Sequence, residues 1–220
     1  MINIAAYNSI IEELKLTNTT LVAVSKTKPA SDIEQLYRLG QRDFGENYVQ
    51  ELVEKESSLP KDIQWHFIGH LQSNKVKYIA PFVHLIHGVD SFSLLKEINK
   101  QAAKHNRVVD CLLQIFIAEE ETKFGFDEIE ITQLFSENNL SSFNNIRIVG
   151  MMGMASFSDN QEKVRTEFRK LKSLFDKYAL MSIANCQLSI ISMGMSGDYK
   201  IAIAEGSTMV RIGSLLFGSR

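Results

Sequence analysis

A lysine at the end of an apolar run is the first feature of this sequence that could do chemistry. Lys26 follows "LVAVS" within the motif "AVSKTKP". An amine that apolar surroundings or a nearby cation keep partly neutral can attack a carbonyl group and form a Schiff base. A lysine at the end of a strand is usually a solvated cap with no chemical role. Lys28, two residues into the loop and next to Pro29, is the weaker candidate for the reactive amine.

Two glycine–serine motifs near the C-terminus have the residue types of an anion site. "SMGMSGD" contains Ser196 and Gly197, and "VRIGS" contains Gly213 and Ser214. Backbone N–H groups and serine hydroxyls can surround a phosphate, and glycine lets the backbone approach it closely. Each motif alone is also typical of a simple turn. A phosphate site is therefore favoured only if the fold brings the two motifs together.

The elements that must position these residues alternate along the chain. Short apolar runs predict strands, and apolar residues three or four apart, as at Leu94, Leu95 and Ile98, predict helices. The predicted strands cover residues 20–25, 42–46, 64–69, 84–90, 111–118, 146–154, 187–194 and 208–213. The predicted helices cover residues 8–16, 30–40, 48–58, 73–81, 91–106, 127–139, 158–179 and 197–206.

This alternation predicts a single domain over residues 1–220, an α/β fold of the (β/α)8 TIM-barrel type. Strands separated by helices pair in parallel through right-handed crossovers, and about eight units of roughly 25 residues match a barrel of near-minimal length. An open doubly wound sheet is the alternative. That fold usually carries a glycine-rich turn after its first strand, and "SKTKPAS" contains no glycine.

In a barrel, chemistry lies at the C-terminal ends of the strands, and phosphate sites favour the loops after strands seven and eight. This rule gathers Lys26, Asn47, Arg211 and the two glycine–serine motifs on one rim. A lysine, a phosphate cradle and a cation that faces an aromatic ring are what pyridoxal 5′-phosphate requires. The predicted rim therefore points to this cofactor.

Composition excludes several other classes of protein. A net charge of −2 over 220 residues, with no dense basic run, gives no footprint for nucleic acid. Because there is neither a secretory signal nor a membrane-length apolar run, we expect a cytoplasmic protein without membrane contacts. Cys111 and Cys186 are expected to be buried thiols rather than a disulfide. We expect no metal site, because the four-residue spacing of His66 and His70 falls on strand and turn rather than helix.

Five motifs, in order along nearly the whole chain, resemble the YggS/PROSC family of pyridoxal phosphate homeostasis proteins. They are "AVSKTKP", "FGENYVQE", "WHFIGHLQSNK", "SMGMSGD" and "GSTMVRIGSLLFG". The resemblance implies a barrel like the N-terminal domain of alanine racemase, with pyridoxal phosphate held as an aldimine of Lys26. It also implies a cofactor site that includes Asn47, Met195, Ser196, Arg211, Gly213 and Ser214, in which Arg211 faces the pyridine nitrogen and the serines and Gly213 hold the phosphate.

Two further positions follow from the same resemblance. The segment "AEEETKFGF" matches the family after its fifth strand, which would place Lys123 near the mouth of the barrel. Phe116 is a departure from the family, because relatives often carry a polar Asn or His at that position.

The functional prediction is a monomeric, non-catalytic carrier of pyridoxal phosphate that exchanges the cofactor with apo-enzymes. The alternative is a pyridoxal phosphate-dependent racemase of the alanine racemase type, which needs a base on each face of its substrate. In those racemases the second base is a tyrosine from an additional domain and a neighbouring subunit. This chain ends at Arg220, just after the eighth predicted strand, and only Tyr48 and Tyr199 lie near strand ends. A phosphate-binding aldolase-like barrel without cofactor is a third interpretation, but it lacks a second catalytic group.

Overall fold

A closed parallel barrel forms the centre of the protein, as the sequence predicted. The computed structural model describes residues 2–118, 124–136, 140–181 and 184–218. The strands are β1 (Thr20–Val24), β2 (Asp43–Glu46), β3 (Gln64–Phe67), β4 (Leu85–Val89), β5 (Val109–Gln114), β6 (Ile146–Met152), β7 (Cys186–Met195) and β8 (Met209–Ile212). Each strand pairs with the next along the chain, and β8 closes the barrel against β1.

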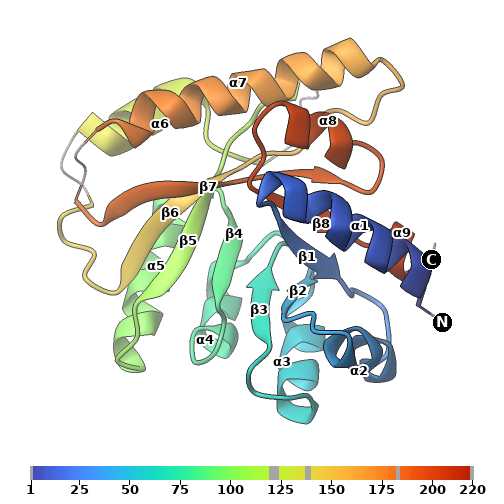
Figure 1. The fold of residues 1–220 in the computed structure, drawn as a ribbon. Coiled ribbons are helices and arrows are strands. Elements are labelled where there is room, and N and C mark those ends of the chain that lie inside the picture. The colour runs from blue at the N-terminus through green and yellow to red at the C-terminus, as the bar shows by residue number, and fades with distance from the viewer. Residues whose placement is uncertain (1, 119–123, 137–139, 182–183, 219–220) are drawn as a thin grey trace.

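Helices surround the barrel on its outside (Figure 1). They are α1 (Ile4–Thr17), α2 (Ala30–Arg38), α3 (Val49–Ser58), α4 (Val76–Ile79), α5 (Phe92–Lys104), α6 (Glu128–Ser136), α7 (Gln161–Ala179), α8 (Tyr199–Ala204) and α9 (Ser214–Phe217). The termini lie side by side, and the Asn3 N–H donates to the Leu216 carbonyl at 2.7 Å.

The helices differ from the prediction in three places. The first helix begins at Ile4 rather than at residue 8, because the Asn3 side chain caps it by accepting from the Ala6 N–H at 3.0 Å. The helix predicted over 73–81 is a 3₁₀ turn, Ser73–Lys75, followed by the short α4. A short helix that the sequence pattern did not predict, α9, follows Gly213 directly.

The fifth strand also ends earlier than predicted. It stops at Gln114, and the chain then pairs with a later segment instead of continuing along the barrel. The Phe116 N–H donates to the Phe126 carbonyl at 3.0 Å, and the Phe126 N–H donates to the Gln114 carbonyl at 2.8 Å. Phe116 therefore lies beyond the strand, in this side pairing.

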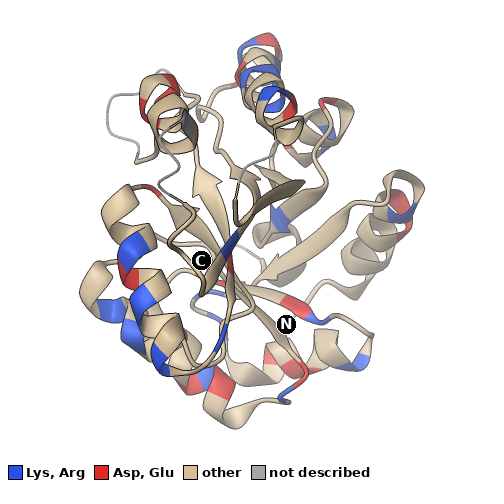
Figure 2. Ribbon diagram, turned by 90° about the vertical axis from the view of Figure 1, so that its left-hand side faces the viewer, with Lys and Arg blue, Asp and Glu red and all other residues tan. Residues whose placement is uncertain are grey.

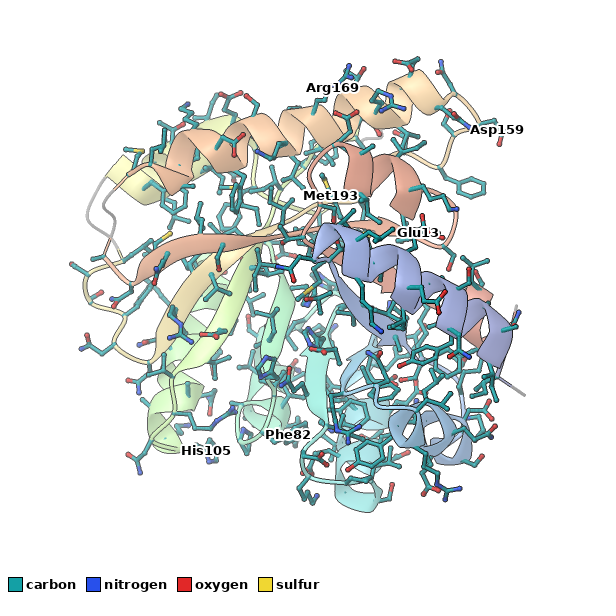
Figure 3. The ribbon with its side chains drawn as sticks, in the orientation of Figure 1. Glu13, Phe82, His105, Asp159, Arg169 and Met193 are labelled. Carbon is teal, nitrogen blue, oxygen red and sulfur yellow. The ribbon has the colours of Figure 1, made fainter. Side chains whose placement is uncertain are left out.

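Two separate apolar clusters stabilise the fold. The larger one lies between the strands and the helices and includes Trp65, as predicted, and Met193, which Figure 3 labels on β7. The smaller one lies inside the barrel and consists of Val22, Leu85, Leu112, Val149, Met152 and Met209, with Met154 and Ile190 packed against it. Because this inner cluster is small, part of the barrel interior is left to polar side chains.

The outer surface carries mixed charge. In the view of Figure 2, lysines and arginines are interspersed with carboxylates along the helices. In the described part of the chain, no helix combines the length and the apolar character needed to cross a bilayer. Cys111 and Cys186 are free thiols, and burial raises the pKa of both, that of Cys186 to about 12.

Candidate functional site

The strand register brings the two glycine–serine motifs and the Lys26 segment to one sector of the rim. On β8, Arg211 pairs with Val22 of β1, and Ile212 pairs with Ala23. A Cβ on Gly213 would lie 3.2 Å from the Val24 carbonyl oxygen, so the two chains approach closely after the strands end. The Gly213 N–H donates to Ser196 Oγ at 3.3 Å, which joins the loops after β7 and β8.

This sector has the geometry of an anion cradle. Met195 ends β7, and its N–H donates to Asp198 Oδ1 at 2.5 Å, closing a tight turn that presents Ser196 and Gly197. The space around the missing Cβ of Gly197 is open. Ser214 is exposed as the first residue of α9. Hydroxyls and backbone N–H groups thus gather where β7 and β8 end, which fits a phosphate group.

The peptide groups on both sides of Lys26 are held by a buried ionic cluster. Lys55 of α3 donates to the Ser25 carbonyl at 2.8 Å, to Glu46 at 2.7 Å and to Glu51 at 2.7 Å. Ser25 Oγ donates to Glu46 at 2.6 Å, and the Thr27 N–H donates to Glu51 at 2.6 Å. We call Ser25, Glu46, Glu51 and Lys55 the Lys55 cluster. It fixes the backbone that presents Lys26.

The Lys55 cluster is costly for the protein to bury. Glu46 is fully buried, and its Oε2 has no hydrogen-bond partner. Burial raises the pKa of the Glu46 carboxyl, and the nearby Lys55 ammonium opposes this shift. Thr27, directly after Lys26, also has a left-handed backbone with a φ of 64°, which is unfavourable for a β-branched residue. Strain and buried charge therefore both gather beside Lys26.

Arg211 is held inside the barrel by neutral acceptors rather than by a carboxylate. Nη1 donates to the Ser192 carbonyl at 2.8 Å and to Ser192 Oγ at 2.5 Å, and Nη2 donates to the Gly153 carbonyl at 3.0 Å. The side chain is 4% exposed. Burial lowers its pKa to about 10, with Asp198 acting in the opposite direction, so the guanidinium stays charged at neutral pH.

Asn47 follows β2 and lines a pocket of about 600 Å³ on the same rim. Its Oδ1 is buried without a hydrogen-bond partner. A Cβ on Gly69 would lie 2.2 Å from the Asn47 carbonyl oxygen, so only glycine permits this close approach of the loops after β2 and β3. An orphaned acceptor beside a pocket is a place where a bound group could supply the missing donor.

The two tyrosines near strand ends have different positions. Tyr199 is buried between the barrel and α1, where its hydroxyl donates to Glu13 Oε2 at 3.0 Å. Its pKa is raised to about 12, first by burial and then by Glu13. Tyr199 is therefore turned away from the rim and unsuited to act as a base. Tyr48 is 53% exposed and lines the pocket next to Asn47.

Sequence reasoning missed the polar residues behind the rim. Lys55, Glu51, His87 and Ser192 were assigned no role, although a histidine and a serine within apolar strands are a signal of a buried polar network. Lys123 lies outside the described residues. Among the described residues, no cluster of three or more His, Cys, Asp or Glu side chains could hold a metal ion.

Comparison with known proteins defines the class to which this barrel belongs. A family model described as "Alanine racemase, N-terminal domain" matches residues 2–220. The fold also resembles alanine racemase from Bartonella henselae, with a TM-score of 0.69, 16% identity, and coverage of 96% of this chain and 58% of that one. This second likeness concerns the fold alone.

Closer relatives narrow the class to one family. A pyridoxal phosphate homeostasis protein of Aquifex aeolicus is 44% identical over 91% of this chain and 86% of that protein, and one of Synechocystis is 37% identical over the whole of both. PipY of Synechococcus elongatus, solved with pyridoxal phosphate bound, superposes with a TM-score of 0.87 at 32% identity, covering 97% of this chain and 99% of that one. This chain belongs to the family of pyridoxal phosphate homeostasis proteins. These relatives are named for homeostasis rather than for an enzymatic activity.

Proposed function

We propose that this chain binds pyridoxal 5′-phosphate on the rim described above and acts as a carrier of the cofactor. The observation that carries the proposal is the pairing of β8 with β1. It puts the buried Arg211, and the hydrogen bond between Ser196 and Gly213, beside the segment that bears Lys26. When bound, the cofactor supplies an aldehyde carbon and an aromatic ring that can accept electrons. The residues of the rim fit both parts of such a ligand.

Lys26 is the proposed point of covalent attachment. Its ε-amine would condense with the aldehyde, forming a carbon–nitrogen double bond and releasing one water molecule. The Lys55 cluster supports this role, because it holds the peptide groups of Ser25 and Thr27 on both sides of Lys26. Buried charge beside a lysine costs stability, and such an arrangement is typical of functional sites.

The other proposed contacts follow from the chemistry of each group. Ser196, Gly213 and Ser214 would hold the phosphate, with Met195 ending the strand beside them. Arg211 would face the pyridine nitrogen. A guanidinium can only donate hydrogen bonds, so that nitrogen would accept one and stay unprotonated. The orphaned Oδ1 of Asn47 would accept a hydrogen bond beside the ring.

The site supports the function of a cofactor carrier better than that of a racemase. An unprotonated ring is a weak electron sink, which suits a protein that holds the cofactor without using it, although racemases share this feature. The position of Tyr199 favours the carrier, because it leaves that hydroxyl bonded to Glu13 instead of available as a second base. We propose that apo-enzymes receive the cofactor. We also propose that the carrier is monomeric.

The attachment point is tested by reduction. Borohydride should fix the cofactor of the yellow holo-protein to the peptide that contains Lys26, as read by mass spectrometry, and Lys26→Ala should remove the visible band. A label on Lys28 or Lys123 would overturn the assignment.

The choice between carrier and racemase is tested by α-proton exchange. The holo-protein is incubated with L- and D-alanine in D₂O and followed by NMR, and an apo-enzyme assay measures transfer. We expect no exchange together with reactivation of the apo-enzyme. Saturable exchange at about 1–10³ s⁻¹, the usual enzyme range, would contradict the carrier.

A further inference from the structure

A chain of hydrogen bonds crosses the inside of the barrel and ends at Arg211. Asp43 Oδ1 lies 2.9 Å from His66 Nε2, and His66 Nδ1 lies 2.9 Å from His87 Nε2. His87 Nδ1 lies 3.0 Å from Ser192 Oγ, which accepts from Arg211. We call these five residues the His66–His87 chain. His66, His87 and Ser192 are fully buried.

The two ends of the His66–His87 chain lie at opposite mouths of the barrel. Asp43 is the first residue of β2, and it lines a polar pocket of about 480 Å³ with Thr20, Gln64 and other residues at the strand starts. Arg211 is near the end of β8, on the side of the proposed cofactor site. The contact between β4 and β7 at His87 and Ser192 joins strands that are not paired in the sheet, so it passes through the barrel interior.

The chemistry of the end groups assigns a direction to every hydrogen bond. The Asp43 carboxylate can only accept, so His66 carries a hydrogen on Nε2, and with a neutral His66 its Nδ1 accepts from His87 Nε2–H. His87 Nδ1 then accepts from the Ser192 hydroxyl, whose oxygen accepts from Arg211. Arginine can only donate, so Ser192 Oγ accepts from Arg211, and the hydroxyl hydrogen of Ser192 can turn toward His87 Nδ1. Two neutral imidazoles thus satisfy each contact, and burial lowers the pKa of His87 well below its ordinary value.

Burying the His66–His87 chain inside the barrel costs free energy. Apolar side chains of similar size would avoid the cost of removing a guanidinium, two imidazoles and a hydroxyl from water. What the polar groups provide is orientation, because an arginine side chain has many rotamers and the chain accepts from one defined nitrogen, Nη1. Ser192 contributes both its hydroxyl and its carbonyl to that nitrogen.

We propose that Ser192 and His87 are positioning residues that hold Arg211 in the orientation in which it meets the cofactor. His66 and Asp43 act through them by fixing the tautomer of His87, so that Ser192 must turn its hydroxyl hydrogen toward His87 and its lone pair toward Arg211. This inference rests on the proposed function, since it gives Arg211 a ligand to meet. It adds residues from β2, β3, β4 and β7 to a site otherwise built at the rim.

The direction of the chain is tested first, on ¹⁵N-labelled protein without cofactor. Long-range ¹H–¹⁵N NMR correlations report which ring nitrogen of each histidine carries the hydrogen. We expect His66 and His87 both to be neutral Nε2–H tautomers at neutral pH, whereas the exposed His105 serves as a solvent-averaged reference. A hydrogen on Nδ1 of His87 would overturn the proposal, because the Ser192 hydroxyl would then accept from His87 instead of donating to it, which reverses the assigned direction.

The effect on the cofactor is tested with an isosteric pair at one position. Ser192→Thr and Ser192→Val add the same volume to the core, but only the threonine keeps a hydroxyl. We expect Ser192→Val to bind pyridoxal phosphate about three- to tenfold more weakly than Ser192→Thr, as the loss of one hydrogen bond implies. The visible absorption band of bound cofactor should shift in the valine variant and return in the threonine variant.

A second pair guards against misfolding. If neither variant folds, Ser192→Ala is compared with Ser207→Ala, which removes an equally buried hydroxyl that donates to backbone carbonyls and does not touch Arg211. Equal affinities and identical spectra within the pair that folds would overturn the positioning role while leaving the proposed function intact. If the unaltered protein takes up no pyridoxal phosphate, the proposed function fails, and the link between Arg211 and the cofactor fails with it. The tautomers of His66 and His87 would still test the direction of the hydrogen bonds.

Discussion

The Lys55 cluster and the His66–His87 chain are two buried polar networks, and they differ in how they satisfy their polar groups. The Lys55 cluster lies between the barrel and α3, and it pairs one ammonium with two carboxylates. The His66–His87 chain lies inside the barrel, where two neutral imidazoles separate its charged ends. The first network holds backbone beside Lys26, and the second holds a side chain, that of Arg211.

This difference matches what each proposed contact requires. A covalent attachment point needs its peptide groups fixed, since the flexible lysine side chain is tied down by the bond itself. A guanidinium that meets a ring nitrogen is not tied by a bond, so its own orientation must be fixed by acceptors. Charge in the first network and neutrality in the second predict different responses to mutation.

The largest effect is expected when the Lys55 cluster loses its cation. Lys55→Met leaves Glu46 buried without its ion-pair partner, which should lower the free energy of unfolding by about 3–5 kcal/mol, measured by urea denaturation. The matched control is Lys61→Met, because Lys61 forms an exposed ion pair with Glu56 that should be worth less than about 1 kcal/mol. The double variant Glu46→Gln with Lys55→Met should recover part of the loss. Equal destabilisation by Lys55→Met and Lys61→Met would show that the buried ion pairs of the Lys55 cluster contribute no more than an exposed one.

The next effect concerns the loops after β7 and β8, where the phosphate is proposed to bind. Ser196→Ala should weaken pyridoxal phosphate binding by about 1.5–3 kcal/mol, since one hydrogen bond to a charged group is lost. Gly213→Val should weaken it further, because a Cβ there would lie 3.2 Å from the Val24 carbonyl oxygen and 3.3 Å from the Val24 Cβ. Equilibrium dialysis measures both, and Ser57→Ala on the exposed face of α3 is the control. Unchanged binding in both variants would move the phosphate elsewhere.

A smaller loss of stability is expected from breaking the neutral network. His87→Leu removes one hydrogen-bond partner each from His66 Nδ1 and from the Ser192 hydroxyl but creates no unpaired charge, so unfolding should become easier by about 1–3 kcal/mol. His105→Leu alters an exposed histidine at the end of α5, labelled in Figure 3, and should change stability by less than about 0.5 kcal/mol. Thermal denaturation followed by circular dichroism compares them. A loss as large as that of Lys55→Met would show that charge is not what separates the networks.

The smallest effect is a difference in pH dependence. Burial raises the folded-state pKa of Glu46 above its ordinary value of 4.5, so the folded protein holds this proton more tightly than the unfolded chain. Folding then takes up a proton between the two pKa values, and this contribution to stability is lost as the pH rises through that interval. Glu46→Gln should remove this dependence, as measured by urea denaturation across a pH series. An unchanged slope would show that Lys55 fully offsets the burial of Glu46.

Much of the fold could be predicted from the sequence, because the signals are local. The alternation of apolar runs and helical patterns predicted all eight strands and the closed barrel, and the barrel in turn predicted that the two glycine–serine motifs would lie on one rim. The errors at Asn3, Gln114 and Gly213 lie at element ends, where a single cap or a side pairing decides the boundary. Such contacts leave little trace in periodicity.

The sequence by itself determined the barrel, the family motifs and the candidate residues on the rim, since each is encoded by neighbours along the chain. Only the tertiary structure decided which polar side chains lie inside the barrel below the rim, and that Tyr199 is not part of the rim. His87 and Ser192 are separated by 105 positions and lie on unpaired strands, yet their side chains meet inside the barrel. Tyr199 lies close to the rim in sequence, but helix α8 directs its hydroxyl outward to Glu13. Closing a barrel creates an interior in which side chains from all strands converge, and no pattern read along one strand records that convergence.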